Sequence, residues 1–274
     1  MQPMTAKGRG APALRPHKLR LRADATVPRY WHRQQRLTTH LFNALGLIFP
    51  AGERFFIRTA LEALPHVTDA TLLAQVRGFI AQESHHAVEH ERVFRVLEEQ
   101  GLPAAELARS VERLLERMGE LRLSLEVRLG VVAALEHFTA TLAEFAFARD
   151  VLDSAHPAMR ELFLWHAAEE IEHQCVAFDL FRSVDASQRT KLLGLAIASP
   201  VLLALWWGMA GRLYLEDRPL RLRSALRELL HIHRTRQLPL RAFSRAVLTY
   251  MHPRFHPSQG ENLGRVAAYF TAAG

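Results

Sequence analysis

One stretch, residues 165–181, restricts the fold of this chain more than any other. Read with helical spacing, it places Glu170 and His173 on one stripe with apolar neighbours. Apolar residues that recur every three or four positions mark the buried face of an amphipathic helix. A carboxylate on such a face loses its hydration and needs a partner. The stripe carries no lysine or arginine, and side chains three residues apart on a helix point toward a common position, so the expected partner is a metal ion.

The remaining segments predict further helices and no strand, which makes the expected fold class all-α. Polar and apolar residues nowhere alternate over a length that indicates a strand. The expected helices cover residues 34–65, 69–100, 104–118, 121–152 and 157–183. Asp69 is expected to cap the second helix. Pro50 is expected to interrupt the first helix or to mark its restart, because proline suits a first helical turn.

Two Glu-x-x-His pairs, Glu83/His86 and Glu170/His173, each lie in the middle of the apolar stripe of a long helix. About one such pair is expected by chance in a chain with this many glutamates and histidines, so the pairs alone are weak evidence. Their arrangement carries more information, because each pair follows a helix whose own stripe contains one glutamate, 30 or 34 residues earlier. Four antiparallel helices can bring these side chains to one level of a bundle core. The residues predicted to meet there are Glu53, Glu83, His86, Glu136, Glu170 and His173.

Four carboxylates and two imidazoles match the ligand set of ferritin-like di-iron and di-manganese proteins, so we expect a ferritin-like four-helix bundle with extra C-terminal helices. Two divalent cations repel each other, and bridging carboxylates offset that repulsion. By analogy with such sites, Glu83 and Glu170 would bridge, and Glu53 and Glu136 would be terminal ligands. Carboxylate oxygens and imidazoles suit iron and manganese, whereas the absence of thiolates disfavours a structural zinc site. We therefore expect two divalent metal ions, with iron favoured and manganese as the alternative.

Other histidines and glutamates lie near the two pairs. His166 precedes Glu170 by four residues and His90 follows His86 by four. Each is therefore expected to be either a metal ligand or a partner that orients a ligand. A further set lies off the stripes and is expected to face solvent or to stand behind the ligands: His85, His137, Glu169 and Glu172.

Three motifs resemble a known family. They read F-P-A-G-E-R-F-F at 49–56, Q-E-S-H-H-A-V-E-H at 82–90 and W-H-A-A-E-E-I-E-H-Q-C-V-A-F-D at 165–179. Together they resemble the bacterial family of predicted metal-dependent hydrolases, and the similarity covers residues 28–256, including the closing F-H-P. The resemblance implies a ferritin-like fold and a metal-dependent activity. The local pattern of His166, Glu170 and His173 also resembles di-iron N-oxygenases, in which a third histidine on the last helix binds metal.

The chain is expected to comprise a basic N-terminal tail, one helical metal-binding domain and a C-terminal tail. The first 25 residues are rich in proline, glycine and arginine and lack helical periodicity. The predicted ranges are 1–27 for the N-terminal tail, 28–256 for the domain (bundle at 34–183, apolar helix at 190–213, C-terminal helices at 218–250) and 257–274 for the C-terminal tail.

Residues 192–211 form an uncharged run flanked by Lys191 and Arg212. A bilayer-spanning helix needs about 20 apolar residues, and membrane helices tolerate an internal proline such as Pro200. Two interpretations stay open. The run is either a helix buried in the bundle or in the interface of a homodimer, or a helix that enters or lies on a membrane. In the second case the substrate would be hydrophobic and would arrive from the membrane.

The chain carries a formal net charge of +7, and nine lysines and arginines fall in its first 36 residues. Such a basic segment is a solvated tail, or it binds an anionic membrane surface or nucleic acid. No helix-turn-helix, zinc-finger or aromatic RNA-binding motif occurs in the sequence, so no nucleic-acid partner is expected. A single cysteine, Cys175, suits a reducing compartment. No apolar run of signal-peptide length precedes residue 42, so the expected location is the cytoplasm.

Three functions are compatible with this pattern. The ligand set favours a redox enzyme in which a di-iron centre activates dioxygen and a hydrophobic small molecule is oxidised. The first alternative is a hydrolase in which two metal ions activate water. The second alternative is a protein that binds metal without catalysing a reaction.

Overall fold

The computed structural model describes residues 14–20, 22–119, 123–149, 151–257 and 263–273. Its helices are α1 (Arg36–Ala63), α2 (Ala70–Glu99), α3 (Ala104–Gly119), α4 (Leu125–Arg149), α5 (Pro157–Val184), α6 (Gln188–Glu216), α7 (Leu222–Arg234), α8 (Leu240–Met251) and α9 (Leu263–Ala273). A short 3₁₀ helix, Leu64–His66, follows α1. The described residues contain no strand, and their one isolated β-bridge joins His32 to Ala155. The prediction of an all-α fold is confirmed.

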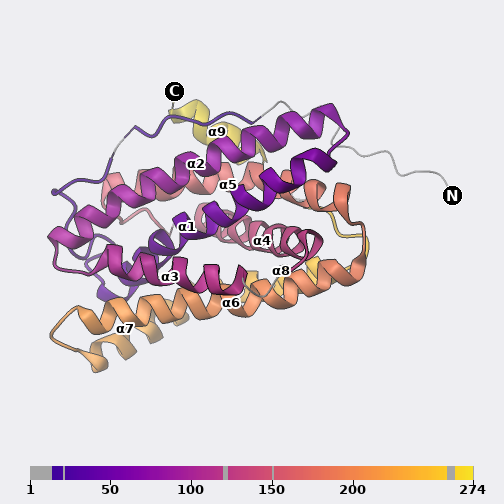
Figure 1. Ribbon diagram of the computed structural model, residues 1–274. Helices are drawn as coiled ribbons and strands as arrows, with labels where there is room; N and C mark the ends of the chain where they lie inside the picture. Colours follow the sequence, from indigo (N-terminus) through magenta and orange to yellow (C-terminus); the bar gives the residue numbers. More distant parts are fainter. Residues whose placement is uncertain (1–13, 21, 120–122, 150, 258–262, 274) are drawn as a thin grey trace.

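Helices α1, α2, α4 and α5 form a bundle (Figure 1). α1 packs against α2, and α4 packs against α5. Contacts of α2 with α5 and of α1 with α4 close the bundle. α6 packs along both α1 and α4 and therefore covers the side of the bundle between them. α8 packs against α4, and α7 packs against α1.

The helix boundaries agree with the sequence prediction at α2 and differ from it inside α1. Asp69 caps α2, because its Oδ1 accepts a hydrogen bond from the backbone N–H of Leu72 at 2.9 Å. α1 continues through Pro50, so the interruption expected at this proline does not occur. A proline inside a helix removes one backbone donor and strains the preceding turn. Here Leu47 and Phe56, on either side of the proline, are both buried in the core, and this tertiary packing keeps the helix continuous.

α4 and α6 touch through their backbones. A Cβ atom placed on Gly194 would lie 2.3 Å from the carbonyl carbon of Gly130, closer than side chains tolerate. Glycine at both positions thus allows α6 to pack directly on the bundle. By length and composition alone α4 and α6 are each apolar enough to span a membrane, a test that the core helices of soluble proteins also pass.

The two ends of the described chain pack on the bundle. Residues 22–35 form no helix, yet Val27 and Trp31 are buried in the core. The sequence predicts a tail at 257–274, and the structure describes α9 within it. Its Val266 is buried in a cluster with Ile171 of α5, and this apolar contact explains why the segment is helical.

Candidate metal centre

Four helices each contribute part of a buried cluster of carboxylates and imidazoles. α1 carries one glutamate, α4 carries another, and α2 and α5 each carry a Glu-x-x-His pair whose members face the same way because they are three residues apart. None of the six residues is more than 3% exposed. The structure therefore brings together all of the residues that the sequence singles out: Glu53, Glu83, His86, Glu136, Glu170 and His173.

Two carboxylates lie between the two imidazoles at the centre of the cluster. Glu83 Oε1 lies 2.8 Å from Nδ1 of His173, and Glu83 Oε2 lies 3.7 Å from Nδ1 of His86. Glu170 Oε1 lies 3.6 Å from both Nδ1 atoms. One ligand atom of each of these four residues lies within 4.8 Å of the others. Carboxylates in this position are able to bridge two cations.

The other two carboxylates lie on opposite sides of this central group. Glu136 Oε2 lies 3.9 Å from Nδ1 of His173. Glu53 instead groups with His86 and His166, with one ligand atom of each within 4.8 Å of the others. The cluster thus has a His173 side and a His86 side, and each has its own terminal carboxylate.

Many polar atoms of this cluster have no hydrogen-bond partner. Both carboxylate oxygens of Glu53 and Glu136 are buried and accept no hydrogen bond. The oxygens of Glu83 face the Nδ1 atoms of His173 and His86, at 2.8 and 3.7 Å, but form no well-aligned hydrogen bond with them. Each unsatisfied buried group costs about 1–3 kcal/mol. Among the described residues, no lysine or arginine forms an ion pair with these carboxylates. The donor set therefore fits bound cations, because no lysine or arginine among the described residues balances the carboxylates.

A second layer of side chains orients the two imidazoles. Nε2 of His86 lies 2.8 Å from Oε2 of Glu169, and the other oxygen of Glu169 accepts a hydrogen bond from the backbone N–H of His17 at 2.6 Å. Nε2 of His173 lies 3.0 Å from Oε1 of Gln82. When Nε2 carries the proton, the lone pair of Nδ1 points at the carboxylates, which is the form that binds metal.

These partners are only partly anticipated by the sequence. Glu169 was expected to face solvent or to stand behind the ligands, and it is fully buried behind His86. Glu172 is also in the second layer, because its Oε2 accepts a hydrogen bond from Nε2 of Gln82 at 3.1 Å. Gln82 and His17 were not predicted at all. One signal was available for Gln82 and Glu169, since each directly precedes a predicted ligand glutamate.

His166 and His90 form a chain that reaches the cluster. Nε2 of His166 lies 3.1 Å from Oε1 of Glu170, and Nδ1 of His166 lies 2.8 Å from Nε2 of His90. The ring of Phe49 stacks on His166, with centroids 4.4 Å apart. His166 therefore touches the carboxylates directly, whereas His90 reaches them through His166.

Burial and the charges of neighbouring side chains shift the pKa values of the four carboxyl groups in different directions. Burial, reinforced by neighbouring carboxylates, raises the pKa of Glu53 and of Glu136 well above the usual range. Burial also acts to raise the pKa of Glu83, but the adjacent His173 outweighs it, so this pKa is lowered. The pKa of Glu170 is likewise lowered against burial, here by His166 and His173.

The pKa values of the two imidazoles are raised. Burial acts to lower the pKa of His86, but its contacts with Glu169 and Glu83 raise it to about 10. Glu83 and Glu170 likewise hold the pKa of His173 well above its usual range against the effect of burial. Without metal, two neutral carboxyl groups, two carboxylates and two imidazolium ions therefore make a neutral cluster. Two divalent cations with four carboxylates and two neutral imidazoles have the same total charge.

The comparison with known proteins agrees with this donor set. A family model described as predicted metal-dependent hydrolase matches residues 15–261. The chain belongs to this family. No curated protein and no solved structure matches the chain.

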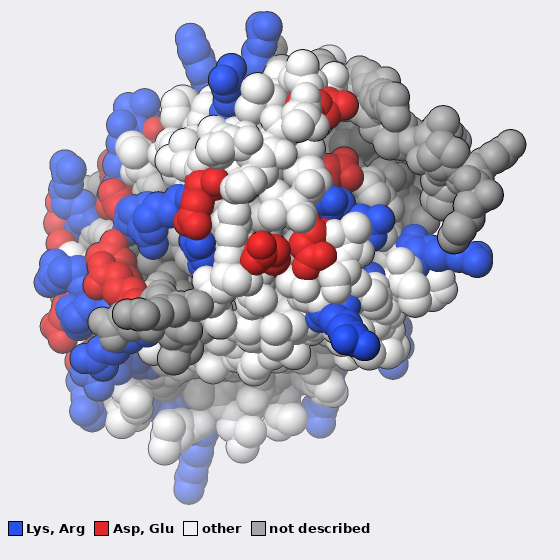
Figure 2. Space-filling view, turned by 45° about the vertical axis from the view of Figure 1, so that its right-hand side comes forward, with Lys and Arg blue, Asp and Glu red and all other residues white. Residues whose placement is uncertain are grey.

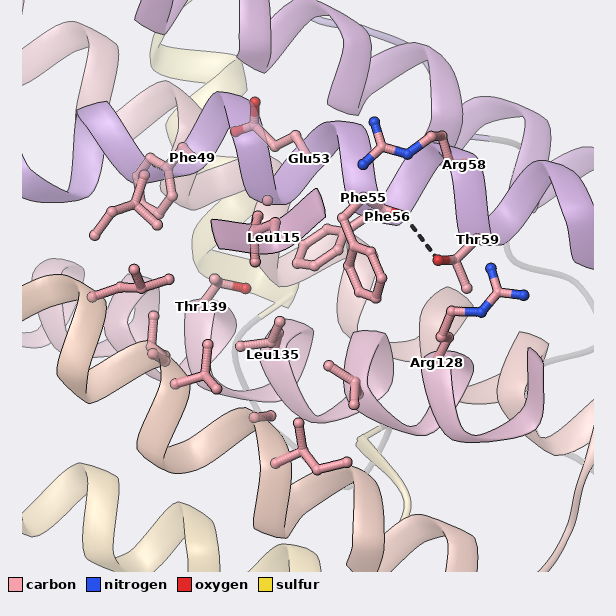
Figure 3. A pocket seen from close by; sticks show the side chains of 18 of the residues that line it. Phe49, Glu53, Phe55, Phe56, Arg58, Thr59, Leu115, Arg128, Leu135 and Thr139 are labelled. Atoms are coloured by element: carbon pink, nitrogen blue, oxygen red, sulfur yellow. Dashed lines mark hydrogen bonds between the residues drawn. The ribbon is translucent and has the colours of Figure 1, made fainter. Parts of the chain in front are cut away.

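In this member of the predicted metal-dependent hydrolases, a large cavity leads to the cluster. It has a volume of about 720 Å³ and lies between α1, α4 and α6 (Figure 3). Glu53, His166 and Glu170 line it at the cluster. Most of the rest of the wall is apolar and includes Phe49, Phe55, Leu135, Ile197, Val201 and Leu205.

Charged side chains line the cavity away from the cluster. Arg128 lies eight residues before Glu136 on α4, which is about 12 Å along a helix. Its guanidinium group pairs with both oxygens of Glu62, at 2.6 and 2.8 Å. Arg58 also lines the cavity, on the side where Figure 3 shows Arg128. A molecule in the cavity would thus contact apolar side chains between the cluster and this charged end.

Proposed function

We propose that this protein is a metal-dependent enzyme with a carboxylate-bridged dinuclear metal centre in a ferritin-like bundle. The observation that carries the proposal is the set of buried carboxylate oxygens and Nδ1 atoms that lie close together without a lysine or arginine among the described residues to balance them. Glu83 and Glu170 would bridge the two ions. Glu53 and His86 would complete one side, and the remaining two ligands, Glu136 and His173, would complete the other.

His166 is a further candidate ligand on the side of Glu53. It lies 3.1 Å from Glu170 and groups with Glu53 and His86, which supports this role. His90 lies behind His166 and would orient it. The oxygen and imidazole donors suit iron or manganese, and we favour iron.

The apolar cavity supports a hydrophobic small-molecule substrate. Its volume of about 720 Å³ falls within the range of roughly 300–1,000 Å³ that is typical of small-molecule sites. Aromatic and aliphatic side chains would bind the substrate and exclude water, while Glu53, His166 and Glu170 mark the end at which it reacts.

Bound iron would supply oxygen activation, which is the reaction type that we favour because of the carboxylate-rich ligand set. The alternative is two-metal hydrolysis, and the family description favours it. A non-catalytic metal-binding role is the third candidate, and the large cavity that opens onto the cluster argues against it.

Metal analysis tests the dinuclear centre directly. Elemental analysis of the protein purified from its native host should find two iron or manganese ions per chain. Glu170→Ala should lower this stoichiometry, whereas Glu144→Ala, a control on α4 outside the cluster, should leave it unchanged. A Glu170→Ala protein that retains both ions would contradict the ligand assignment.

The reaction type needs a separate measurement. Reduced, iron-loaded protein should consume dioxygen and show a transient change in absorbance on exposure to air. An iron-loaded protein that is inert to oxygen, together with turnover of a test ester by the manganese- or zinc-loaded form, would instead establish the hydrolase.

A further inference from the structure

The outer face of α6 is apolar and exposed. No charged residue occurs between positions 192 and 211. Within this run Leu193 is 48% exposed, Leu203 39% and Trp207 36%, and Pro200 between them is exposed as well. Soluble proteins rarely expose a continuous apolar surface of this length unless something binds it.

α7 carries a second apolar stripe, which is exposed and does not pack on the rest of the protein. Its inner side packs on α1 through Ile232, which is buried. On its outer side Leu222, Leu226 and Leu230 follow one another at four-residue spacing and are 68%, 58% and 43% exposed. A helix needs only one apolar stripe to pack on its own protein, so the outer stripe is available for a partner.

The same region is strongly basic. Residues 188–251 contain eleven lysines and arginines and three aspartates and glutamates. All of these basic side chains except Lys191 are exposed. α6, α7 and α8 occupy the lower part of Figure 1, and the lower part of the turned view in Figure 2 shows basic and uncharged surface but no acidic side chain.

The three acidic residues in this region are all engaged. Asp217 is fully buried, and its Oδ1 lies 2.6 Å from the guanidinium group of Arg29. Glu228 accepts hydrogen bonds from the backbone N–H and the hydroxyl group of Thr38, at 2.6 and 2.8 Å. Glu216 pairs with Arg212. The surface around the two apolar stripes is therefore more positive than the composition alone implies.

We propose that α6 and α7 dock this protein on the surface of an anionic lipid bilayer. An exposed apolar stripe bordered by arginines is the pattern of helices that lie in a membrane interface, and tryptophan is enriched at that depth. Juxtamembrane basic residues are attracted to anionic lipids. A second copy of the chain is a poorer partner, because two such faces would bring their arginines together. α6 lies on the bilayer and does not cross it, since its inner face is held against Gly130.

The docking face and the cavity lie on different sides of one helix. Ile197, Val201 and Leu205 point from α6 into the cavity, while Leu203 and Trp207 are exposed on its outer side. A helix with its side chains is about 10–12 Å across. If the proposed function holds, the substrate is an apolar molecule dissolved in the bilayer, which enters the cavity beside α6. The docking itself does not depend on that function.

Vesicle flotation with the metal-loaded full chain tests the docking. The protein should float with vesicles of phosphatidylcholine that contain 30% phosphatidylglycerol, and should bind vesicles of phosphatidylcholine alone at least tenfold more weakly. Added salt should weaken the binding, because basic side chains contribute to it. The double variants Leu222→Glu/Leu226→Glu and Arg223→Glu/Arg227→Glu should each lose at least tenfold in binding.

The matched control is Leu61→Glu, which changes a leucine of α1 that is 50% exposed outside the docking face and should bind vesicles as the parent does. Equal binding of all variants, or no binding to either vesicle, would overturn the proposal. So would a dimer in sedimentation that Leu222→Glu dissociates, since the face would then serve a second copy. Metal content measured on the same samples separates the two proposals, because loss of vesicle binding with two ions retained overturns only the docking.

Discussion

Nε2 of His86 lies 2.8 Å from Oε2 of Glu169, on the opposite side of the imidazole ring from Glu83 and Glu170. Glu169 is itself held by His17, 152 residues away in the sequence. This contact sets the tautomer of His86, and through it the direction of the Nδ1 lone pair. Residues that are not ligands thus prepare the cluster for metal.

Replacing Glu169 by Gln should weaken metal binding by about 10- to 100-fold, because the amide is uncharged and no longer holds the Nε2 proton of His86 as strongly. The bundle should remain folded, since glutamine has nearly the same shape. Competition with a chelator measures the affinity, and circular dichroism checks the fold. Glu161→Gln, eight residues earlier on α5, is the control and should bind metal normally. An unchanged affinity in Glu169→Gln would show that the contact does not orient the ligand.

Metal binding should release at least two protons per chain near pH 7. His86 and His173 each lose one, because the neighbouring carboxylates raise the pKa of both imidazoles. Glu53 and Glu136 add to the release, because burial raises their pKa values. Calorimetric titration in buffers of different ionisation enthalpy counts the protons. Glu53→Gln should release about one proton fewer. Release of fewer than two protons by the parent protein would contradict these charge states.

The stability of the metal-free protein should fall as pH rises above neutrality. A histidine with a raised pKa stabilises the fold fully below its unfolded pKa of about 6.5, and this contribution is lost as pH rises toward about 10 for His86. The raised pKa values of Glu53 and Glu136 act in the same direction, because their neutral forms are favoured in the folded state. Thermal unfolding between pH 6.5 and 10 measures the effect. The metal-loaded protein should change much less over this range, and parallel curves for the two forms would refute the prediction.

Filling the cavity should block ligand binding and leave the metal in place. Val201→Trp adds a large ring on the inner side of α6, where Val201 lines the cavity. A fluorescent fatty-acid analogue, used as an apolar probe, should bind at least about tenfold more weakly to this variant, a loss of roughly 1.4 kcal/mol. Leu203→Trp, on the exposed outer side of the same helix, should keep probe affinity. Equal probe binding by both variants would place the apolar site elsewhere.

The backbone contact between α4 and α6 should tolerate no side chain. Gly194→Ala should destabilise the protein by about 1–3 kcal/mol, because its Cβ would lie 2.3 Å from the backbone of Gly130 and α6 would have to move. Gly211→Ala is the matched control on the same helix, since nothing lies within 4 Å of a Cβ placed there. It should stabilise α6 by up to about 1 kcal/mol, because alanine is the better helix former. Denaturant unfolding compares the two, and equal stabilities would refute the close approach.

Local patterns in the sequence predicted much of this architecture. Apolar periodicity located the bundle helices, and Asp69 marked the start of α2 as predicted. The two Glu-x-x-His pairs pointed to a cluster because their spacing puts both side chains on one helix face. The exception, α1 through Pro50, arose where tertiary contacts outweighed a local signal.

By itself, then, the sequence determined that the chain is all-α and which residues face the bundle core, because helical periodicity is a property of neighbouring residues. Only the tertiary structure decided which ring nitrogen of each histidine faces the carboxylates, which side of α6 lines the cavity, and that His17 and Gln82 stand behind the ligands. Those relationships join residues on different segments. They depend on how the helices are rotated and how deeply they pack against one another, and the spacing of residues along one helix does not specify either.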